Sequence, residues 1–281
     1  MQKIALIVDS ACDLSLETIK EKNINLLPLR ISYSYGEFKD KIDISADEIY
    51  SNLEKEVPKT SLPSAEDLEN ILTSLEDNGY THVIAITISS GLSGTFNSIR
   101  LALEDHPKLI SHVFDTKILA MPEGIVALEV ADLINSGKTF EEIVASIPKI
   151  RKNITGYFTV NTLEYLKKGG RIGRIAGTIG DMLNLKPIVT VDENGIYYTV
   201  CKARGRKQSM TKLAGLLKDK LAEGPCKVWV LHGGVLEEAK MFLEALKNLD
   251  NILSIDISQI SPALGVHGGP GLLGLAIQRV N

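Results

Sequence analysis

Short apolar runs alternate with amphipathic stretches through the first half of the chain. Residues 4–8, 26–34, 83–86 and 113–116 are short and largely apolar, which is typical of buried strands. Other stretches of this half have the spacing of helices: 14–22, 46–55, 65–77, 95–104, 123–135 and 140–151. Asp13 is placed to cap the first of these helices. Strands that alternate with helices predict a mainly parallel sheet covered by helices on both faces.

The pattern changes after residue 152. Asp192-Glu193-Asn194-Gly195 joins strands predicted at 187–191 and 196–202 and is a strong hairpin signal. Further strands are predicted at 157–160, 228–231 and 252–257, and helices at 162–168, 211–221 and 236–249. A hairpin together with helices is typical of an α+β domain with a mixed sheet. The sequence therefore predicts an α/β protein with a three-layer N-terminal domain of residues 1–153 and a C-terminal α+β domain of residues 154–281. No low-complexity linker separates them, so we expect a ligand cleft between closely packed domains.

Polar and small residues follow the strand predicted at 83–86. Ser89-Ser90-Gly91-Leu92-Ser93-Gly94-Thr95 leads directly into the helix predicted at 95–104. Free amides and the positive end of a helix dipole make such a turn suitable for a carboxylate or a phosphate, with Ser93 as the leading contact. Asp9 and Asp115 end neighbouring strands and would lie at the same edge of the sheet, where they could orient site loops or only cap turns. A capped helix after an ordinary turn uses the same residue types and stays an alternative.

Composition adds limits on the class of protein. Hydrophobic residues make up 44% of the 281 residues and charged residues 23%, as in ordinary globular proteins. The net charge of −4 gives no case for nucleic acid as a partner, and no apolar run approaches the ~18 residues of a membrane-spanning helix. Cys12, Cys201 and Cys226 are scattered and odd in number, which fits a reducing cytoplasm. No Cys/His spacing suggests zinc, and we expect neither a metal nor a cofactor.

Several enzyme motifs are absent or incomplete. The chain has no phosphate-loop motif Gly-x-x-x-x-Gly-Lys-Ser/Thr, and no glycine follows the first strand as in dinucleotide-binding folds. Gly91-Leu92-Ser93-Gly94-Thr95 is one residue out of register with the hydrolase motif Gly-x-Ser-x-Gly. Ser93 with His267 and either Asp9 or Asp115 could still form a triad in space, so a serine hydrolase acting on acyl esters is the alternative function.

Six short motifs occur in order along the chain. They are Val8-Asp9-Ser10 with Asp13-Leu14, Lys59-Thr60-Ser61-Leu62-Pro63-Ser64, Ser89 to Thr95, Val113-Phe114-Asp115-Thr116, Thr162 to Ile172 with Lys168-Gly169-Gly170-Arg171, and His267-Gly268-Gly269-Pro270-Gly271. Together they resemble the DegV family of bacterial fatty-acid-binding proteins over essentially the whole chain. Leu62 stands where the family often has Gln, and Gly268 where it has Thr or Val, so the pocket could differ there.

The resemblance implies a protein that encloses one long-chain fatty acid, such as palmitate or a C18 acid, between two domains. By the same resemblance Thr60 and Ser93 would hydrogen-bond the carboxylate, with Gly94, Thr95 and His267 completing the site. Several members are the acyl-binding subunit of a fatty acid kinase, in which a separate subunit supplies ATP and the product is an acyl phosphate. This chain would then be a lipid carrier and not an enzyme by itself, with transient contact with a membrane surface as an open option.

Arg171 and His267 have a second implied role at the same end of the site. Arg171, with Lys167, Lys168 and Arg174 nearby, could contact phosphate or dock the kinase, or could simply belong to a solvated basic face. His267 could contact the carboxylate or the incoming phosphate, or could satisfy a loop carbonyl among its neighbouring glycines. A module that binds a small phosphate compound without lipid is a third reading of the same residues.

Overall fold

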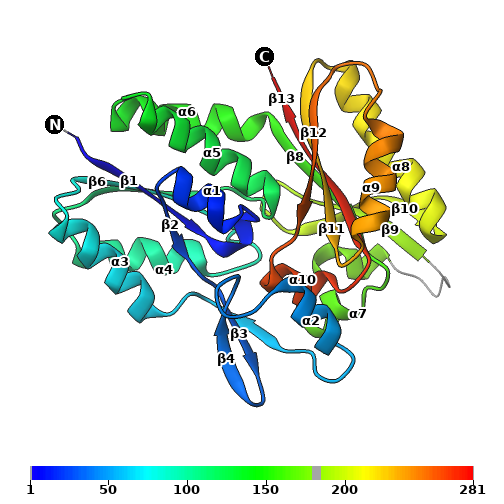
Figure 1. Ribbon diagram of the computed structural model, residues 1–281, viewed down its shortest axis with the longest axis horizontal. Coiled ribbons are helices and arrows are strands. Elements are labelled where there is room, and N and C mark those ends of the chain that lie inside the picture. The colour runs from blue at the N-terminus through cyan, green and yellow to red at the C-terminus, as the bar shows by residue number, and fades with distance from the viewer. Residues whose placement is uncertain (1, 179–184, 281) are drawn as a thin grey trace.

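The computed structural model describes residues 2–178 and 185–280 and shows two lobes, each built on its own sheet (Figure 1). The first lobe has a parallel sheet of four strands in the order β2-β1-β6-β7. Its strands and helices are β1 (Ile4–Asp9), β2 (Ile24–Leu27), β6 (His82–Thr87), β7 (Ile110–Asp115), α1 (Leu16–Glu21), α3 (Ala65–Asp77), α4 (Thr95–Ala102), α5 (Met121–Asn135) and α6 (Phe140–Lys152), with 3-10 turns η1 (Ser10–Cys12) and η2 (Leu103–Asp105).

The second lobe has a mixed sheet of six strands in the order β10-β9-β8-β13-β11-β12. Its elements are β8 (Ile154–Thr159), α7 (Glu164–Lys168), η3 (Gly173–Thr178), β9 (Leu185–Val191), β10 (Tyr197–Arg204), α8 (Gly205–Ala222), β11 (Cys226–Gly233), α9 (Leu236–Leu246), β12 (Ile252–Gln259), α10 (Pro262–Gly268) and β13 (Leu272–Arg279). The predicted hairpin at Asp192–Gly195 joins β9 to β10 in antiparallel register. The predicted α/β class, with one parallel and one mixed sheet, is confirmed.

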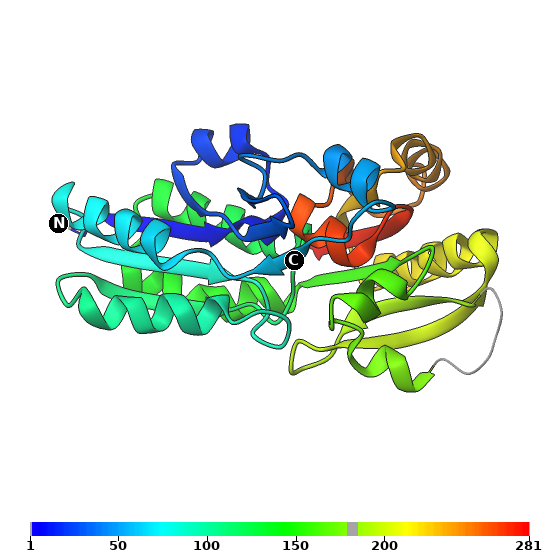
Figure 2. The same ribbon diagram turned by 90° about the horizontal axis from the view of Figure 1, so that it is seen from below.

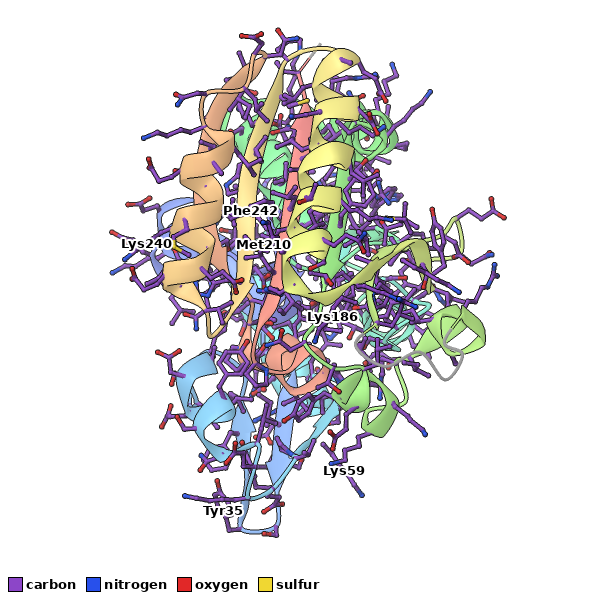
Figure 3. The ribbon with its side chains drawn as sticks, turned by 90° about the vertical axis from the view of Figure 1, so that its right-hand side faces the viewer. Tyr35, Lys59, Lys186, Met210, Lys240 and Phe242 are labelled. Carbon is purple, nitrogen blue, oxygen red and sulfur yellow. The ribbon has the colours of Figure 1, made fainter. Side chains whose placement is uncertain are left out.

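Helices cover both faces of the four-stranded sheet, as the alternation of strands and helices predicts. Leu68 and Leu72 of α3 pack with Ile99 of α4 against one face. Ile125 of α5 and Ile143 of α6 belong to the core on the other face. In the second lobe α8 and α9 lie side by side over the six-stranded sheet, as Figure 3 shows with Met210 and Phe242 above the strands.

Helix α5 lies between the two sheets and contacts strands of both. Its first eleven residues are almost continuously apolar, and those from Met121 to Ala127 are all buried. A helix that is apolar on every side must be covered on every side. The two lobes meet over α5 and lie side by side in Figure 2. The domain boundary between residues 153 and 154 stays a prediction, which limited proteolysis would test.

The strand predicted at 26–34 is wrong, because the segment forms two strands of two different sheets. Pro28 separates β2 from β3 (Arg30–Tyr33), since proline has no N–H to continue a ladder of hydrogen bonds. Strand β3 pairs instead with β4 (Gly36–Lys39) and β5 (Lys59–Ser61) in a small antiparallel sheet. This sheet lies at the bottom of Figure 1, with the tip of β3 and β4 pointing away from both lobes, and α2 (Ala46–Asn52) beside it packs against α10.

Asp13 does not cap a helix, so the predicted cap is wrong. Helix α1 begins two residues later than expected, and the side chain of Ser15 accepts the capping hydrogen bond from the Thr18 amide. Asp13 has a positive φ of 58° and turns its carboxylate toward the second lobe. Within residues 2–178 and 185–280, no helix is long and apolar enough to cross a membrane.

Candidate functional site

A cavity of about 240 Å³ lies between the two lobes. A single water needs roughly 10–15 Å³ by the same measure, so this space is large enough for an organic ligand. The first lobe contributes aliphatic walls at Leu29, Ile88, Leu92, Ile118 and Leu119, and the second at Leu166, Val191, Leu231, Ile260, Leu264 and Leu272. The sequence names none of these as ligand contacts, because apolar side chains in buried elements carry no signal that separates a cavity wall from ordinary core.

Thr60 and His267 meet at one part of this cavity. Thr60 comes from β5 and His267 from the last turn of α10, and Thr60 Oγ1 lies 2.7 Å from His267 Nε2. Both residues line the cavity together with Ser93. The structure therefore brings together the three residues predicted for the head-group site from sequence positions as far apart as 60 and 267.

The imidazole of His267 is neutral at neutral pH. Burial, and then the nearby Arg171 guanidinium, lower the pKa of His267 to about 4. Its Nδ1 is buried and has no hydrogen-bond partner among the described residues. An N–H buried without an acceptor is rarer than a bare ring nitrogen, so we assign the proton to Nε2 from the hydrogen-bond pattern. His267 then donates to Thr60 Oγ1, and the hydroxyl proton of Thr60 is free to point into the cavity.

Glycine is required where the helix α7 ends beneath this ring. A Cβ on Gly169 would lie 2.0 Å from His267 Nδ1. The backbone of Gly169 has an ordinary φ of −78°, so the contact and not the conformation excludes a side chain. Gly169 thus allows His267 to reach Thr60.

Two carboxylates hold the loop that carries Ser93, and of these Asp9 is fully buried and Asp115 partly buried. Asp9 Oδ2 accepts a hydrogen bond of 2.8 Å from the Ile88 amide, and Asp115 Oδ1 accepts one of 3.0 Å from the Ser90 amide. Lys117 Nζ adds a contact of 2.7 Å with Ser90 Oγ. The contacts support both readings of Asp9 and Asp115. Each carboxylate orients the site loop, and each also caps a turn, Asp9 at the Ala11 amide and Asp115 at the Lys117 amide.

The loop ends at the N-terminus of α4. Gly94 is the N-cap residue and makes no side-chain cap, so the first amides of the helix have no cap from it. Ser93 Oγ lies 2.9 Å from Thr95 Oγ1, and Thr95 is fully buried. Gly94 packs under Leu62, whose Cδ2 would be 3.3 Å from a Cβ at this position. The arrangement places hydroxyl donors and a helix N-terminus at the cavity, where they could bind an anionic group.

Arg171 lines the cavity, and its guanidinium is turned inward. Its Nη1 donates to the Gly169 carbonyl at 2.7 Å and its Nε donates to the Leu92 carbonyl at 3.3 Å. Arg171 therefore links the second lobe to the Ser93 loop. Its neighbours behave as a solvated face, because Lys168 pairs with Glu164 and Arg174 with Asp192.

The triad considered as an alternative is not assembled in the structure. Ser93 Oγ is paired with Thr95 Oγ1, while His267 Nε2 is paired with Thr60 Oγ1. Asp9 and Asp115 are both engaged with backbone amides of the Ser93 loop. Across the part of the chain that the structure describes, no group of three or more His, Cys, Asp or Glu side chains is arranged to hold a metal ion.

Tyr197 is a cavity residue that the sequence did not reveal. It is buried on β10, faces the cavity, and packs edge-on against Phe158 at 5.2 Å between ring centroids. The residue follows the predicted hairpin, but the turn signal gives no information on which way the ring points.

Comparison with known sequences agrees with this arrangement of motifs and elements. The sequence model of a family described as "Uncharacterised protein, DegV family" matches residues 3–280. The chain belongs to the DegV family. A DegV domain-containing protein of Clostridium acetobutylicum is 49% identical over 278 residues, which cover 99% of each chain.

Solved structures of DegV proteins share the whole fold. A fatty-acid-binding DegV family protein from Thermus thermophilus superposes with a TM-score of 0.92 at 27% identity, covering 99% of this chain and all of the other. A fatty-acid-binding protein from Eubacterium ventriosum, described with stearic acid, gives a TM-score of 0.88 at 30% identity, covering 99% of this chain and 98% of the other. DegV proteins of solved structure thus include proteins that bind fatty acids.

Proposed function

We propose that this DegV protein binds one long-chain fatty acid in the cavity between its lobes and presents it to a separate ATP-dependent kinase. The observation that carries the proposal is a cavity whose walls are mostly aliphatic and whose polar lining includes the paired Thr60 and His267 and also Ser93. Fatty-acid-binding relatives with the same fold support it.

The aliphatic walls would supply most of the affinity. A C16 tail has about fifteen methylene-scale groups, and burial of each contributes about 0.8 kcal/mol, so the gross driving force is about 12 kcal/mol. Association costs of about 4–15 kcal/mol are set against this sum. The polar end then needs only to orient the carboxylate and to replace its lost water.

Neutral donors at the polar end suit a carboxylate that has to react. In our proposal Thr60 Oγ1–H and Ser93 Oγ–H donate to the carboxylate, and the Gly94 amide provides a further donor. Thr95 contributes by fixing Ser93 Oγ, to which its amide donates at 3.4 Å. A carboxylate oxygen would attack the γ-phosphorus of ATP held by the kinase, the oxygen–phosphorus bond would form, and ADP would leave. A direct ion pair with a strong cation would lower the nucleophilicity of that oxygen.

A partner would supply the nucleotide, because this chain has no phosphate-loop motif. Arg171 lies at the cavity beside the Ser93 loop, and we propose that Arg171 and His267 contact the incoming phosphoryl group or the partner. We also propose a cytoplasmic location, since all three cysteines are free; transient contact with a membrane surface stays a prediction.

The experiment has two parts. Mass spectrometry of an organic extract from protein made in bacteria should show one long-chain fatty acid per chain. In a reconstitution with a fatty acid kinase subunit and ATP, Ser93→Ala and Thr60→Val should lower acyl-phosphate formation more than they lower lipid retention. Thr211→Val, an exposed threonine on α8, is the control and should leave both unchanged. Protein that never retains lipid after loading, or wild-type turnover in both site variants, would reject the proposal.

A further inference from the structure

The first turn of α10 is held by two carboxylates from the other lobe. Asp13 Oδ1 accepts a hydrogen bond of 2.7 Å from the Ser261 amide, and Asp40 Oδ1 accepts one of 2.9 Å from the Ala263 amide. Both carboxylates are buried, with exposed fractions of 6% for Asp13 and 0% for Asp40. The amides at the start of a helix have no partner within the helix, so these two acceptors replace the missing ones.

The first lobe fixes the two carboxylates in different ways, Asp40 by a further hydrogen bond and Asp13 by its backbone conformation. Asp40 Oδ2 accepts a hydrogen bond of 2.5 Å from Ser10 Oγ, which in turn accepts one from the Leu29 amide. Asp13 keeps its carboxylate aimed at Ser261 through a backbone with positive φ, a conformation that a residue other than glycine rarely adopts. The positions of the two acceptors are therefore set by contacts and backbone conformation within the first lobe.

A tyrosine ring adds a second contact between α10 and the first lobe. The ring of Tyr50, from α2, lies against Gly233, Gly234 and Gly265 of the second lobe. A Cβ on any of these three glycines would come within 2.9 Å of a Tyr50 side-chain atom. The small residues let α10 approach α2 closely enough for the carboxylates to reach its amides.

The opposite end of α10 carries His267, the partner of Thr60. The helix has seven residues and begins with Pro262 at its first position, so its two ends are only about two turns apart. A shift of its first turn away from Asp13 and Asp40 would carry His267 away from Thr60. The Thr60–His267 hydrogen bond therefore depends on the hydrogen bonds that hold the Ser261 and Ala263 amides.

We propose that Asp13 and Asp40 are positioning residues for the fatty acid site, holding α10 so that His267 meets Thr60, and that ionisation of the two carboxylates loosens this hold and speeds ligand release. The proposal rests on the function proposed above and adds a control on how the ligand leaves.

The charges around the two carboxylates give the direction of the pH effect. The groups that face them are Asp9, Cys12, Lys41, Tyr50, Glu123 and Tyr197, and of these six only Lys41 is a cation. Burial raises the pKa of Asp13 to about 7 and that of Asp40 to about 6. Burial also raises the pKa of Glu123 well above its usual range, so this group stays protonated near neutral pH.

The sign follows from linkage between protonation and docking. A carboxyl group exposed to water by the movement of α10 would have a pKa of about 3.9. The docked state, with the raised pKa, therefore takes up protons near neutral pH. The free-energy advantage of docked α10 over displaced α10 is greatest in acid. It is lost as the pH rises through about 6 to 7, because ionised carboxylates must then stay buried. Ligand release should accelerate over that range.

The test is the dissociation rate of a fluorescent C16 fatty acid between about pH 5.5 and pH 8.5. Wild-type protein should release the ligand faster as the pH rises. Asp13→Asn and Asp40→Asn keep an acceptor oxygen for the α10 amides but do not titrate, so they should flatten the profile. Asp40→Ala removes the acceptor of the Ala263 amide and should speed release by at least about 10-fold, since a buried backbone N–H is left without a partner.

A matched control uses a contact between the lobes that does not involve α10. Glu129 Oε1 of α5 accepts a hydrogen bond of 2.7 Å from Gln278 Nε2 of β13, and Glu129→Ala should leave the pH profile unchanged. Asn variants with the wild-type profile, or an Asp40→Ala variant with wild-type release, would overturn the proposal. Should Asp40→Ala not fold, the two Asn variants decide.

Hydrogen exchange without lipid separates this proposal from the proposed function. In unloaded protein, the Ser261 and Ala263 amides should exchange slowly, and Asp13→Ala and Asp40→Ala should accelerate exchange at the amide that each carboxylate contacts. Unchanged exchange at both amides would contradict the hold on α10. Slow, aspartate-dependent exchange in a protein that binds no fatty acid would reject the proposed function while leaving the hold intact.

Discussion

The cavity has two regions that are built in opposite ways. At the polar end each side chain has a named partner, and Thr60 and His267 pair across 207 positions of the sequence. Along the apolar region the walls are aliphatic side chains from both lobes, without any single contact on which the others depend. Under the proposed function, orientation of the fatty acid would depend on a few hydrogen bonds, whereas affinity would be spread over many replaceable contacts.

A charge in the apolar region should have the largest effect. Leu119→Asp places a carboxylate on the cavity wall at a half-buried position. The tail would then desolvate that charge on binding, so we expect fatty acid affinity to fall by at least about 100-fold. The measurement is a fluorescent fatty acid titration, together with the urea midpoint to verify folding.

The control for this variant is Leu101→Asp on α4, where the leucine is 52% exposed and outside the cavity. It should bind like the wild type. Near-normal affinity in a folded Leu119→Asp variant would show that the tail does not lie along this wall.

At the polar end, one methyl group should be enough to disrupt function. Gly169→Ala would place a Cβ 2.0 Å from His267 Nδ1 and push the ring away from Thr60. Overpacking costs about 1–3 kcal/mol, so we expect acyl-phosphate formation with a kinase subunit to fall by about 10-fold while lipid is retained. Gly177→Ala, with nothing within 4 Å of the added methyl, should have no effect. Equal turnover in the two variants would show that the position of His267 does not matter for acyl-phosphate formation.

Local sequence signals predicted the loop and helix start at the polar end of the cavity, but they predicted neither the long-range pairs there nor the residues of the apolar walls. The Ser93 loop follows a strand and opens a helix, and both elements are short-range patterns that the structure contains. Thr60 and His267 were assigned to the site by resemblance to the DegV family, but their hydrogen bond depends on the docking of two lobes. The same is true of Asp13, whose partner Ser261 is 248 positions away. No periodicity within a segment encodes such pairs.

The cavity wall contains a strained residue. Ala120 lines the cavity with φ 62° and ψ −157°, a region that is essentially restricted to glycine and costs about 1–3 kcal/mol. Ala120→Gly should therefore stabilise the protein by about 1 kcal/mol after the extra entropy of an unfolded glycine is subtracted. Urea unfolding measures this change.

Ala120 is the N-cap residue of α5, and Ala127 lies within that helix. Ala127→Gly is the comparison and should destabilise the protein by at least about 1 kcal/mol, because the backbone at Ala127 is ordinary helix. A destabilised Ala120→Gly variant would mean that the methyl group contributes more through packing than its backbone conformation costs.

The smallest expected effect concerns the Tyr197 hydroxyl in the apolar region. A saturated tail would strip water from this group without replacing it, so Tyr197→Phe should tighten binding of a saturated C16 acid by about threefold. Tyr198→Phe, whose ring is 37% exposed outside the cavity, should change nothing. Weaker binding in Tyr197→Phe would show that the hydroxyl contacts the ligand directly.

A crystal structure of the protein loaded with a saturated C18 acid tests the central claim most directly. The account predicts carboxylate oxygens within about 2.5–3.2 Å of both Thr60 Oγ1 and Ser93 Oγ, with the tail along the aliphatic walls. A cavity that stays empty at saturating ligand, or a fatty acid whose methyl end lies between Thr60 and Ser93, would contradict it.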